Sequence, residues 1–261
     1  MFDGHKLAWH ADRVNAWLAG DHIAPITIDC ALTRRCSYRC VYCYGALQRN
    51  EEKSLTRDII LRFLDDAREI GVKAVSFVSD GESTCSPHLY DAITHGRANG
   101  LDMALSTNGY LLKDNRLEEI LPALTYLRFN ISAAYPRRYS EIHGCSEDCY
   151  YKVISTIREC VRIKKERGLL VTIGLQMVLL PELCDQVLPL AKLGQELGVD
   201  YTVIKHCSDD ELGSLGVDYS SYFELVGTLK EAEAASTNDY TVGVKWSKIL
   251  SGGKRCYSRC Y

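Results

Sequence analysis

Apolar and polar positions along the chain alternate between short hydrophobic runs and longer amphipathic stretches. The apolar runs predict six buried strands, at residues 24–32, 73–79, 101–107, 126–132, 169–180 and 200–206. Helical periodicity predicts helices before and between them, at residues 6–19, 54–71, 87–99, 115–124, 148–167 and 182–197. Nearly continuous apolar strands that alternate with helices are typical of parallel sheets with right-handed crossovers.

This pattern predicts an α/β protein: a partial (β/α)6 barrel of parallel strands with helices outside, plus a short C-terminal extension. The repeat alone is also compatible with a flat, doubly wound sheet. We expect an N-terminal helix in residues 1–25, the barrel in residues 26–206 and the extension in residues 207–261. Within the extension, residues 219–235 predict a helix and residues 240–246 alternate as a strand does.

Composition narrows the setting in which the protein works. The net charge is −3, with 46% hydrophobic and 25% charged residues, which favours neither a nucleic-acid partner nor a membrane surface. No apolar run is long enough to span a membrane, and the N-terminus has no secretory signal pattern. We therefore expect a cytoplasmic protein, in which several of the 12 cysteines are better suited to metal binding than to disulfides.

Three cysteines stand together directly after the first predicted strand. Cys36, Cys40 and Cys43 form the pattern C-x3-C-x2-C, and the next cysteine is Cys85. Iron–sulfur clusters take thiolate ligands, so three thiolates without a nearby fourth leave one iron open to another ligand. A zinc knuckle, or reduced thiols that bind nothing, is the alternative that the spacing leaves open.

The same loop resembles the hallmark of the radical SAM (S-adenosylmethionine) superfamily, C-x3-C-x-aromatic-C, with Tyr42 as the aromatic residue. The resemblance implies a [4Fe-4S] cluster on Cys36, Cys40 and Cys43, with the amino and carboxylate groups of S-adenosylmethionine on the fourth iron. It also implies reductive cleavage of this cofactor to a 5′-deoxyadenosyl radical, which abstracts hydrogen from the substrate. The backbone at Tyr42 would lie near the adenine.

Polar residues at successive strand ends agree with this resemblance. After the second strand, Asp80-Gly81-Glu82 is similar to the superfamily's Gly-Gly-Glu type motif, with its first glycine replaced, and would bind the cofactor's amino group. The remaining candidate contacts to the ribose, carboxylate or adenine are Ser106, Asn108, Asn130, Ser132 and Gln176. Gln176 could instead form a hydrogen bond with a neighbouring strand or side chain.

Other cysteines offer further chemistry. Cys207 follows the sixth strand and is a candidate residue near the substrate, whereas Cys145 and Cys149 are equally compatible with a metal site and with free thiols. Cys256 and Cys260 near the C-terminus resemble the start of a SPASM or twitch extension, which holds an auxiliary iron–sulfur cluster. Such extensions contain more cysteines than this tail does.

The resemblance thus implies a radical SAM enzyme that acts on a small metabolite, such as a sugar, or on a peptide. Oxidation, epimerisation and cross-linking are all compatible outcomes, and a flavodoxin or ferredoxin would supply the electron. The alternative is a non-catalytic iron–sulfur or zinc protein for electron transfer or sensing. No phosphate-binding G-x4-G-K-[ST] loop occurs in the chain.

Overall fold

One parallel sheet organises the structure, a computed structural model that describes residues 9–43, 45, 53–78, 80–210 and 212–250. Its strands follow one another in chain order, and every neighbouring pair is parallel. The strands are β1 (Thr27–Cys30), β2 (Ala74–Phe77), β3 (Asp102–Thr107), β4 (Leu124–Asn130), β5 (Thr172–Leu179), β6 (Tyr201–His206) and β7 (Thr241–Val244).

The sequential strand order confirms the partial barrel. A doubly wound sheet reverses its strand order at a switch point, and the order β1 to β7 contains no reversal. The barrel gains a seventh strand, β7, which pairs with β6 although the sequence placed it in the C-terminal extension. The sheet therefore continues past residue 206, while the division into three segments stays a prediction.

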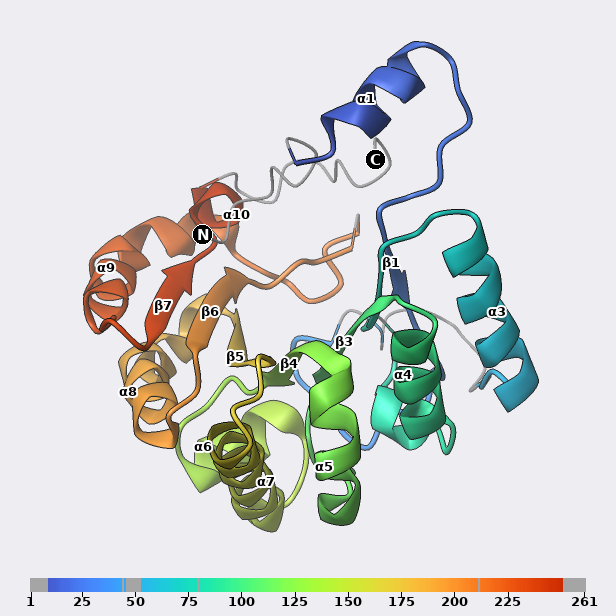
Figure 1. Cartoon of the computed structure of the whole chain (residues 1–261). Helices are drawn as coiled ribbons and strands as arrows, with labels where there is room; N and C mark the ends of the chain where they lie inside the picture. The colour runs from blue at the N-terminus through green and yellow to red at the C-terminus, as the bar shows by residue number, and fades with distance from the viewer. Residues whose placement is uncertain (1–8, 44, 46–52, 79, 211, 251–261) are drawn as a thin grey trace.

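Helices lie around the outside of the sheet (Figure 1), except α1 (Ala11–Leu18), which extends away from it. The others are α3 (Arg57–Glu69), α4 (Leu89–Ala98), α5 (Leu117–Ile120), α6 (Pro136–His143), α7 (Glu147–Glu166), α8 (Val187–Leu197), α9 (Val226–Ala234) and α10 (Trp246–Leu250). Short 3₁₀ turns complete the path: η2 (Ser83–Cys85), η3 (Asp114–Arg116), η4 (Leu121–Ala123), η5 (Pro181–Gln186) and η6 (Tyr219–Leu225). No described helix has the length and apolar character needed to cross a membrane.

The core lies between the sheet and these helices. Leu105, Phe129 and Leu175 on adjacent strands are fully buried, as are Ile93 and Ile157 on the covering helices. Burying a side chain of this size stabilises the fold by about 1.5–3 kcal/mol. Most of the apolar runs recognised in the sequence are thus buried strands. The expectation of a buried first strand is wrong, because β1 lies at the edge of the sheet and its residues are exposed or half-buried.

Helix α1 stands apart from this core, as Figure 1 shows. None of its residues is buried, and the Trp17 side chain is 61% exposed. Arg13 ties the helix to the barrel, because its guanidinium donates hydrogen bonds to the carbonyl oxygens of Ala24 (2.6 Å) and Gly71.

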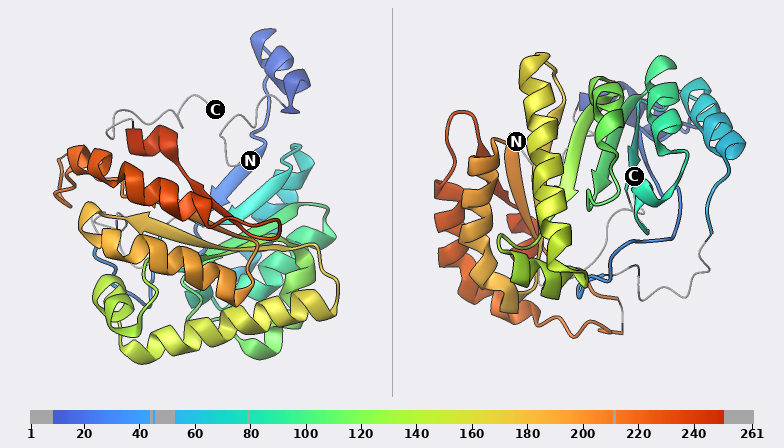
Figure 2. Two further views of the ribbon diagram at one scale, coloured as in Figure 1. Left: turned by 90° about the vertical axis from the view of Figure 1, so that its left-hand side faces the viewer. Right: turned by 90° about the horizontal axis from the view of Figure 1, so that it is seen from below.

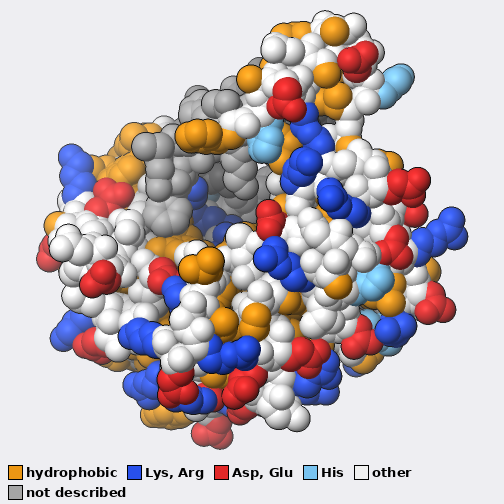
Figure 3. Space-filling model, viewed as in Figure 1, with side chains coloured by type: hydrophobic (Ala, Val, Ile, Leu, Met, Phe, Trp, Pro, Cys, Tyr) orange, Lys and Arg blue, Asp and Glu red, His pale blue; other side chains and the backbone are white. Residues whose placement is uncertain are grey.

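The strand arrowheads in both views of Figure 2 point to one edge of the barrel, where the loop after β1 also lies. The opposite side, which faces the viewer in Figure 3, carries interspersed positive and negative side chains. Neither sign gathers into a broad patch on that face. In a parallel barrel, reactive groups sit at the carboxyl ends of the strands, so the site is sought at the edge to which the arrowheads point.

Candidate functional site

The loop that carries the three cysteines leaves β1 and is anchored on the C-terminal end of α6. The backbone N–H of Arg39 donates to the carbonyl of His143 (3.1 Å), and that of Val41 donates to the carbonyl of Ile142 (2.9 Å). Within the loop, Cys43 N–H donates to the Cys40 carbonyl (3.1 Å). The cysteine spacing is therefore set by backbone hydrogen bonds to a separate element.

The three thiols lie close enough to influence one another electrostatically. Burial, together with the charges of Cys36 and Cys43, raises the pKa of Cys40 to about 12. Burial also raises the pKa of Cys36 to about 11, with contributions from Glu82 and Cys43. Cysteines bind metal as thiolates, so a bound iron would favour the loss of these protons.

The three thiols suit an iron–sulfur cluster, whose irons take thiolate ligands. A tetrahedral zinc site brings every sulfur to about 2.3 Å from one centre. An iron–sulfur cube places each thiolate on a separate iron and so tolerates wider spacing. The donor set fits a [4Fe-4S] cluster.

Glu82 lies beside this loop as a buried carboxylate. Its side chain follows β2, is 4% exposed and accepts hydrogen bonds from Thr107 Oγ1 (2.6 Å) and the Asn108 backbone N–H (2.7 Å). Thr84 donates to it through both its backbone N–H (2.9 Å) and its hydroxyl (2.8 Å). These four donors are neutral, and a carboxylate accepts a stronger hydrogen bond from a cationic donor such as an ammonium group.

Gly81 permits the turn after β2 to press against the cysteine loop. Its φ is +67°, and a Cβ atom there would lie 2.4 Å from the Thr33 carbonyl oxygen and 2.8 Å from that of Arg35. The next residue, Glu82, donates its N–H to the same Arg35 carbonyl (2.8 Å). Only glycine fits both the backbone conformation and the available space. Asp80 lies more openly, with Oδ2 3.9 Å from Arg34 Nε.

Three of the predicted strand-end residues form one hydrogen-bonded row across β3, β4 and β5. Asn130 Oδ1 accepts from Ser106 Oγ (3.2 Å) and from Gln176 Nε2 (3.0 Å). Arg128 Nε donates to Ser106 Oγ (3.1 Å). Gln176 thus has the partner on a neighbouring strand that the sequence allowed. The row presents polar groups along the edge where the cysteine loop lies.

Asn108 joins the end of β3 to the cysteine loop. Its Nδ2 donates to Ser37 Oγ (3.0 Å), and its Oδ1 accepts from the Tyr110 N–H (3.0 Å). Together with the bond from its backbone to Glu82, these contacts fix the loop against two strand ends. The structure therefore brings Asn108 and Glu82 together with the cysteines.

His143, which the sequence analysis missed, lies on the other side of the loop. It is 1% exposed, and burial lowers its pKa to about 3, which keeps the imidazole neutral. Its Nδ1 is 3.3 Å from Cys40 Sγ and 3.4 Å from the Tyr42 hydroxyl. The hydroxyl of Ser132, a candidate cofactor contact, is fully buried and donates to Tyr42 Oη (3.1 Å).

Sequence signals for His143 were present. It ends α6, a helix that was not predicted although Pro136 occupies its first turn and Gly144, with φ of +60°, ends it. Proline at the start and glycine after the end are the ordinary punctuation of a helix. What the sequence could not supply is the contact between residues 40 and 143.

Cys207 follows β6 and faces the cysteine loop. Its Sγ lies 3.8 Å from the Tyr42 carbonyl oxygen, and its side chain is buried. Burial raises its pKa to about 12, so the thiol is protonated at neutral pH. Its backbone N–H donates to Tyr222 Oη (3.1 Å), which holds η6 against the strand end. A substrate role for Cys207 stays a prediction.

The remaining candidate cysteines are in two pairs. Cys256 and Cys260 lie outside the described residues. Cys145 is near enough to the cysteine loop to contribute to the raised pKa of Cys40. Cys145 and Cys149 flank the start of α7, where Cys149 Sγ is 3.5 Å from Ser146 Oγ.

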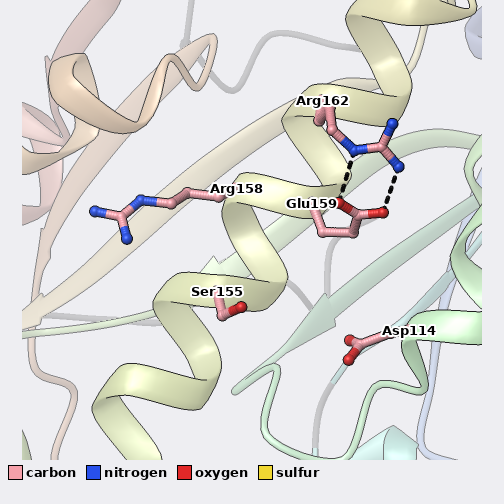
Figure 4. A pocket seen from close by; sticks show the side chains of 5 residues that line it. All are labelled: Asp114, Ser155, Arg158, Glu159 and Arg162. Atoms are coloured by element: carbon pink, nitrogen blue, oxygen red, sulfur yellow. Dashed lines mark hydrogen bonds and ion pairs between the residues drawn. The ribbon is translucent and has the colours of Figure 1, made fainter.

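A surface pocket on α7 is remote from this chemistry. It is lined by residues of α7 and η3, and Figure 4 shows Arg162 bonded to Glu159 while Arg158 points away. Its residues are Asp114, Ser155, Arg158, Glu159 and Arg162. None of them belongs to a carboxyl strand end, so the pocket is no part of the candidate site.

Comparison with known proteins assigns a family to this geometry. The profile described as "Radical SAM superfamily" matches residues 31–193, which include the cysteine loop, Glu82 and the row on β3 to β5. The match covers more than half of the chain.

Individual relatives are more distant. The chain is 28% identical over 180 residues to the tungsten-containing aldehyde ferredoxin oxidoreductase cofactor-modifying protein of Pyrococcus furiosus, covering 67% of this chain and 49% of that protein. It is 25% identical over 170 residues to a probable GTP 3′,8-cyclase of Saccharolobus islandicus, covering 65% and 53%. The chain therefore spans about half the length of these curated relatives.

Among solved structures, Streptococcus suis SuiB bound to S-adenosylmethionine is similar in fold. The TM-score is 0.72 at 15% sequence identity, and the match covers 97% of this chain and 59% of SuiB. SuiB bound to its precursor peptide SuiA gives a TM-score of 0.70 at 14% identity, covering 94% and 55%. At this identity the likeness establishes the fold of the barrel.

Proposed function

The chain belongs to the radical SAM superfamily, and from that membership we propose that it is an enzyme that reductively cleaves S-adenosylmethionine to act on an organic substrate. Members of this superfamily use a [4Fe-4S] cluster together with S-adenosylmethionine. When both are bound, they supply a 5′-deoxyadenosyl radical that abstracts hydrogen from an unactivated carbon. The protein contributes binding, orientation and the exclusion of water.

Cys36, Cys40 and Cys43 would hold the cluster. This assignment is supported by the mutual proximity of the thiols and by the backbone bonds that fix the loop on α6. Cofactor cleavage under anaerobic reduction would distinguish this enzyme from a zinc knuckle or a passive iron–sulfur carrier.

The cofactor's amino group would lie at the Glu82 carboxylate. Gly81 brings the backbone after β2 close to the loop, and Asp80 would complete the three-residue motif. A buried carboxylate with neutral hydrogen-bond donors gains most from a cationic partner. Asn108 holds this region against the loop through Ser37.

The ribose and carboxylate would meet the polar row of Ser106, Asn130 and Gln176. The hydrogen bonds within the row orient Asn130 and Gln176 before any ligand arrives. Preorganised polar groups lose less entropy when a ligand binds. The Tyr42 backbone would lie near the adenine, and its carbonyl already faces the Cys207 thiol.

We propose a small metabolite, such as a sugar, or a peptide as the substrate, with oxidation, epimerisation or cross-linking as the outcome. The names of relatives support both classes: a cofactor-modifying protein and a GTP cyclase on one side, and a peptide-bound SuiB on the other. Cys207 would stand near the substrate, and a flavodoxin or ferredoxin in the cytoplasm would deliver the electron.

Cys256 and Cys260 would contribute to an auxiliary iron–sulfur cluster. Replacing both by alanine would then lower the iron content without abolishing cofactor cleavage. An unchanged iron count in the double variant would remove this part of the proposal and leave the catalytic cluster untouched.

The observation that carries the proposal is the placement of Glu82 beside a loop of three interacting thiols. The test is anaerobic reconstitution, reduction and measurement of methionine and 5′-deoxyadenosine. Deuterium transfer from labelled sugars, nucleotides and peptides into 5′-deoxyadenosine then distinguishes the substrate classes. Reconstituted protein that binds no iron, or that binds iron and never cleaves the cofactor, would contradict the proposed function.

A further inference from the structure

Cys40 has two polar side chains beside its sulfur. His143 Nδ1 lies 3.3 Å from Cys40 Sγ. The Tyr42 hydroxyl also forms a hydrogen bond with Cys40. Cys36, in contrast, accepts from the backbone N–H of Tyr38 at 3.5 Å. The environment of Cys40 is thus built from a helix, α6, and from the loop itself.

Two backbone N–H groups fix the direction of these hydrogen bonds. The Ser132 N–H can only donate, and it donates to His143 Nε2 (3.1 Å). A neutral imidazole that accepts at Nε2 carries its proton at Nδ1. His143 therefore presents an N–H group to the Cys40 sulfur.

The hydrogen bond from the Tyr42 hydroxyl to Cys40 is oriented by another backbone donor. The Val178 N–H donates to Ser132 Oγ (3.1 Å), so the hydroxyl proton of Ser132 is directed to Tyr42 Oη (3.1 Å). The Tyr42 proton is then free to point at Cys40. The fully buried Ser132 thus orients both donors to Cys40: its backbone N–H orients His143, and its hydroxyl orients Tyr42.

We propose that His143 is a positioning residue, which as the Nδ1–H tautomer donates a hydrogen bond to the Cys40 ligand and raises the reduction potential of the cluster. The proposal rests on the proposed function, because it needs the cluster on Cys40. Reduction adds negative charge that the sulfur ligands share, and an N–H donor stabilises that charge. The donor thereby makes the cluster easier to reduce.

The tautomer can be measured in the cluster-free chain, independently of any activity. With ¹⁵N-labelled histidine, the ring nitrogens of His143 should show the Nδ1-protonated pattern, identified by the loss of its signals in a His143→Gln variant. The Nε2-protonated tautomer, or a cationic ring at neutral pH, would overturn the proposal.

Two variants then separate the donor from the acceptor. His143→Asn keeps an amide donor near the position of Nδ1, whereas His143→Gln keeps a polar group near Nε2 and loses the donor to Cys40. We expect His143→Gln to lower the equilibrium constant for one-electron reduction about tenfold, a shift of about 59 mV to more negative potential. His143→Asn should remain closer to the unsubstituted protein.

The potential is read by an anaerobic titration followed by electron paramagnetic resonance, with iron content as the control for cluster loading. Equal potentials for the two variants and the unsubstituted chain would overturn the proposal. If neither variant binds iron, the ¹⁵N measurement of the His143 tautomer in the cluster-free chain decides whether the proposal holds. Failure of the proposed function is a different result: an unsubstituted chain that binds no cluster or cleaves no cofactor.

Discussion

The cysteine loop has two sides that differ in charge and in what they can bind. On the Glu82 side, formed by Glu82, Thr107 and Asn108, a carboxylate gathers neutral donors and raises the pKa of the nearby Cys36. On the His143 side, formed by His143, Tyr42 and Ser132, neutral hydrogen-bond donors lie next to Cys40. Both sides are buried.

The difference shows how one loop can serve two tasks. A negative group next to a metal site attracts a cationic ligand and disfavours a second anion. A neutral donor next to a thiolate stabilises that ligand and adds no charge. In the function proposed above, the Glu82 side would bind the cofactor's ammonium, and the His143 side would hold the cluster and raise its reduction potential.

Removing the thiols should have the largest effect, because both sides depend on them. A variant with Cys36, Cys40 and Cys43 all changed to alanine should lose the iron of the catalytic cluster and all cofactor cleavage while the barrel stays folded. Circular dichroism and iron analysis measure this, with Cys184→Ala as the control. Cofactor cleavage by the triple variant would disprove the assignment.

Gly81→Ala should rank second, because it pushes the Glu82 side away from the loop. The added Cβ would contact the Thr33 carbonyl at 2.4 Å, in a backbone conformation with positive φ. We expect a loss of about 3 kcal/mol in the free energy of unfolding and reduced iron loading. Gly168→Ala is the matched control, since its φ is +60° and nothing lies within 4 Å. Equal losses in both variants would show that the close approach has no role.

Glu82→Gln should affect the cofactor and spare the cluster. A hydrogen bond to a charged group contributes about 1.5–3 kcal/mol, so affinity for S-adenosylmethionine should fall about 10- to 100-fold. Equilibrium dialysis under anaerobic conditions measures this, with iron content expected to stay constant. Glu141→Gln on the exposed surface of α6 is the control. Unchanged affinity would remove Glu82 from the cofactor site.

Tyr42→Phe should have the smallest effect, on the His143 side. It removes one neutral hydroxyl donor from Cys40 and leaves the His143 donor in place. The equilibrium constant for cluster reduction should fall about threefold or less. Tyr151→Phe, on an exposed part of α7, is the control. A shift larger than that of His143→Gln would mean that Tyr42 is the principal donor.

Much of the fold could be predicted because buried parallel strands are rich in apolar residues. The strands β2 to β6 and most of the helices between them follow that signal, whereas the edge strand β1 is exposed or half-buried. The pattern also identified residues 240–246 as a strand, but local pattern does not specify the partner of a strand. Pairing of β7 with β6 depends on the crossover through α9, which follows a long loop.

The two sides of the loop were unequally predictable. Gly81 and Glu82 stand at a strand end in a motif with recognisable spacing, so the sequence indicated the Glu82 side. The His143 side depends on a contact between residues separated by about 100 positions. Its signal, a short helix between Pro136 and Gly144, is local, but the approach of that helix to Cys40 is a property of the folded barrel.

We propose above that three thiolates hold a cluster whose open iron binds the cofactor beside Glu82. The most direct test is electron–nuclear double resonance on the reduced protein with S-adenosylmethionine that carries ¹⁵N in its amino group. The spectrum should show coupling between that nitrogen and the cluster. Bound cofactor and a reduced cluster without such coupling would contradict the account.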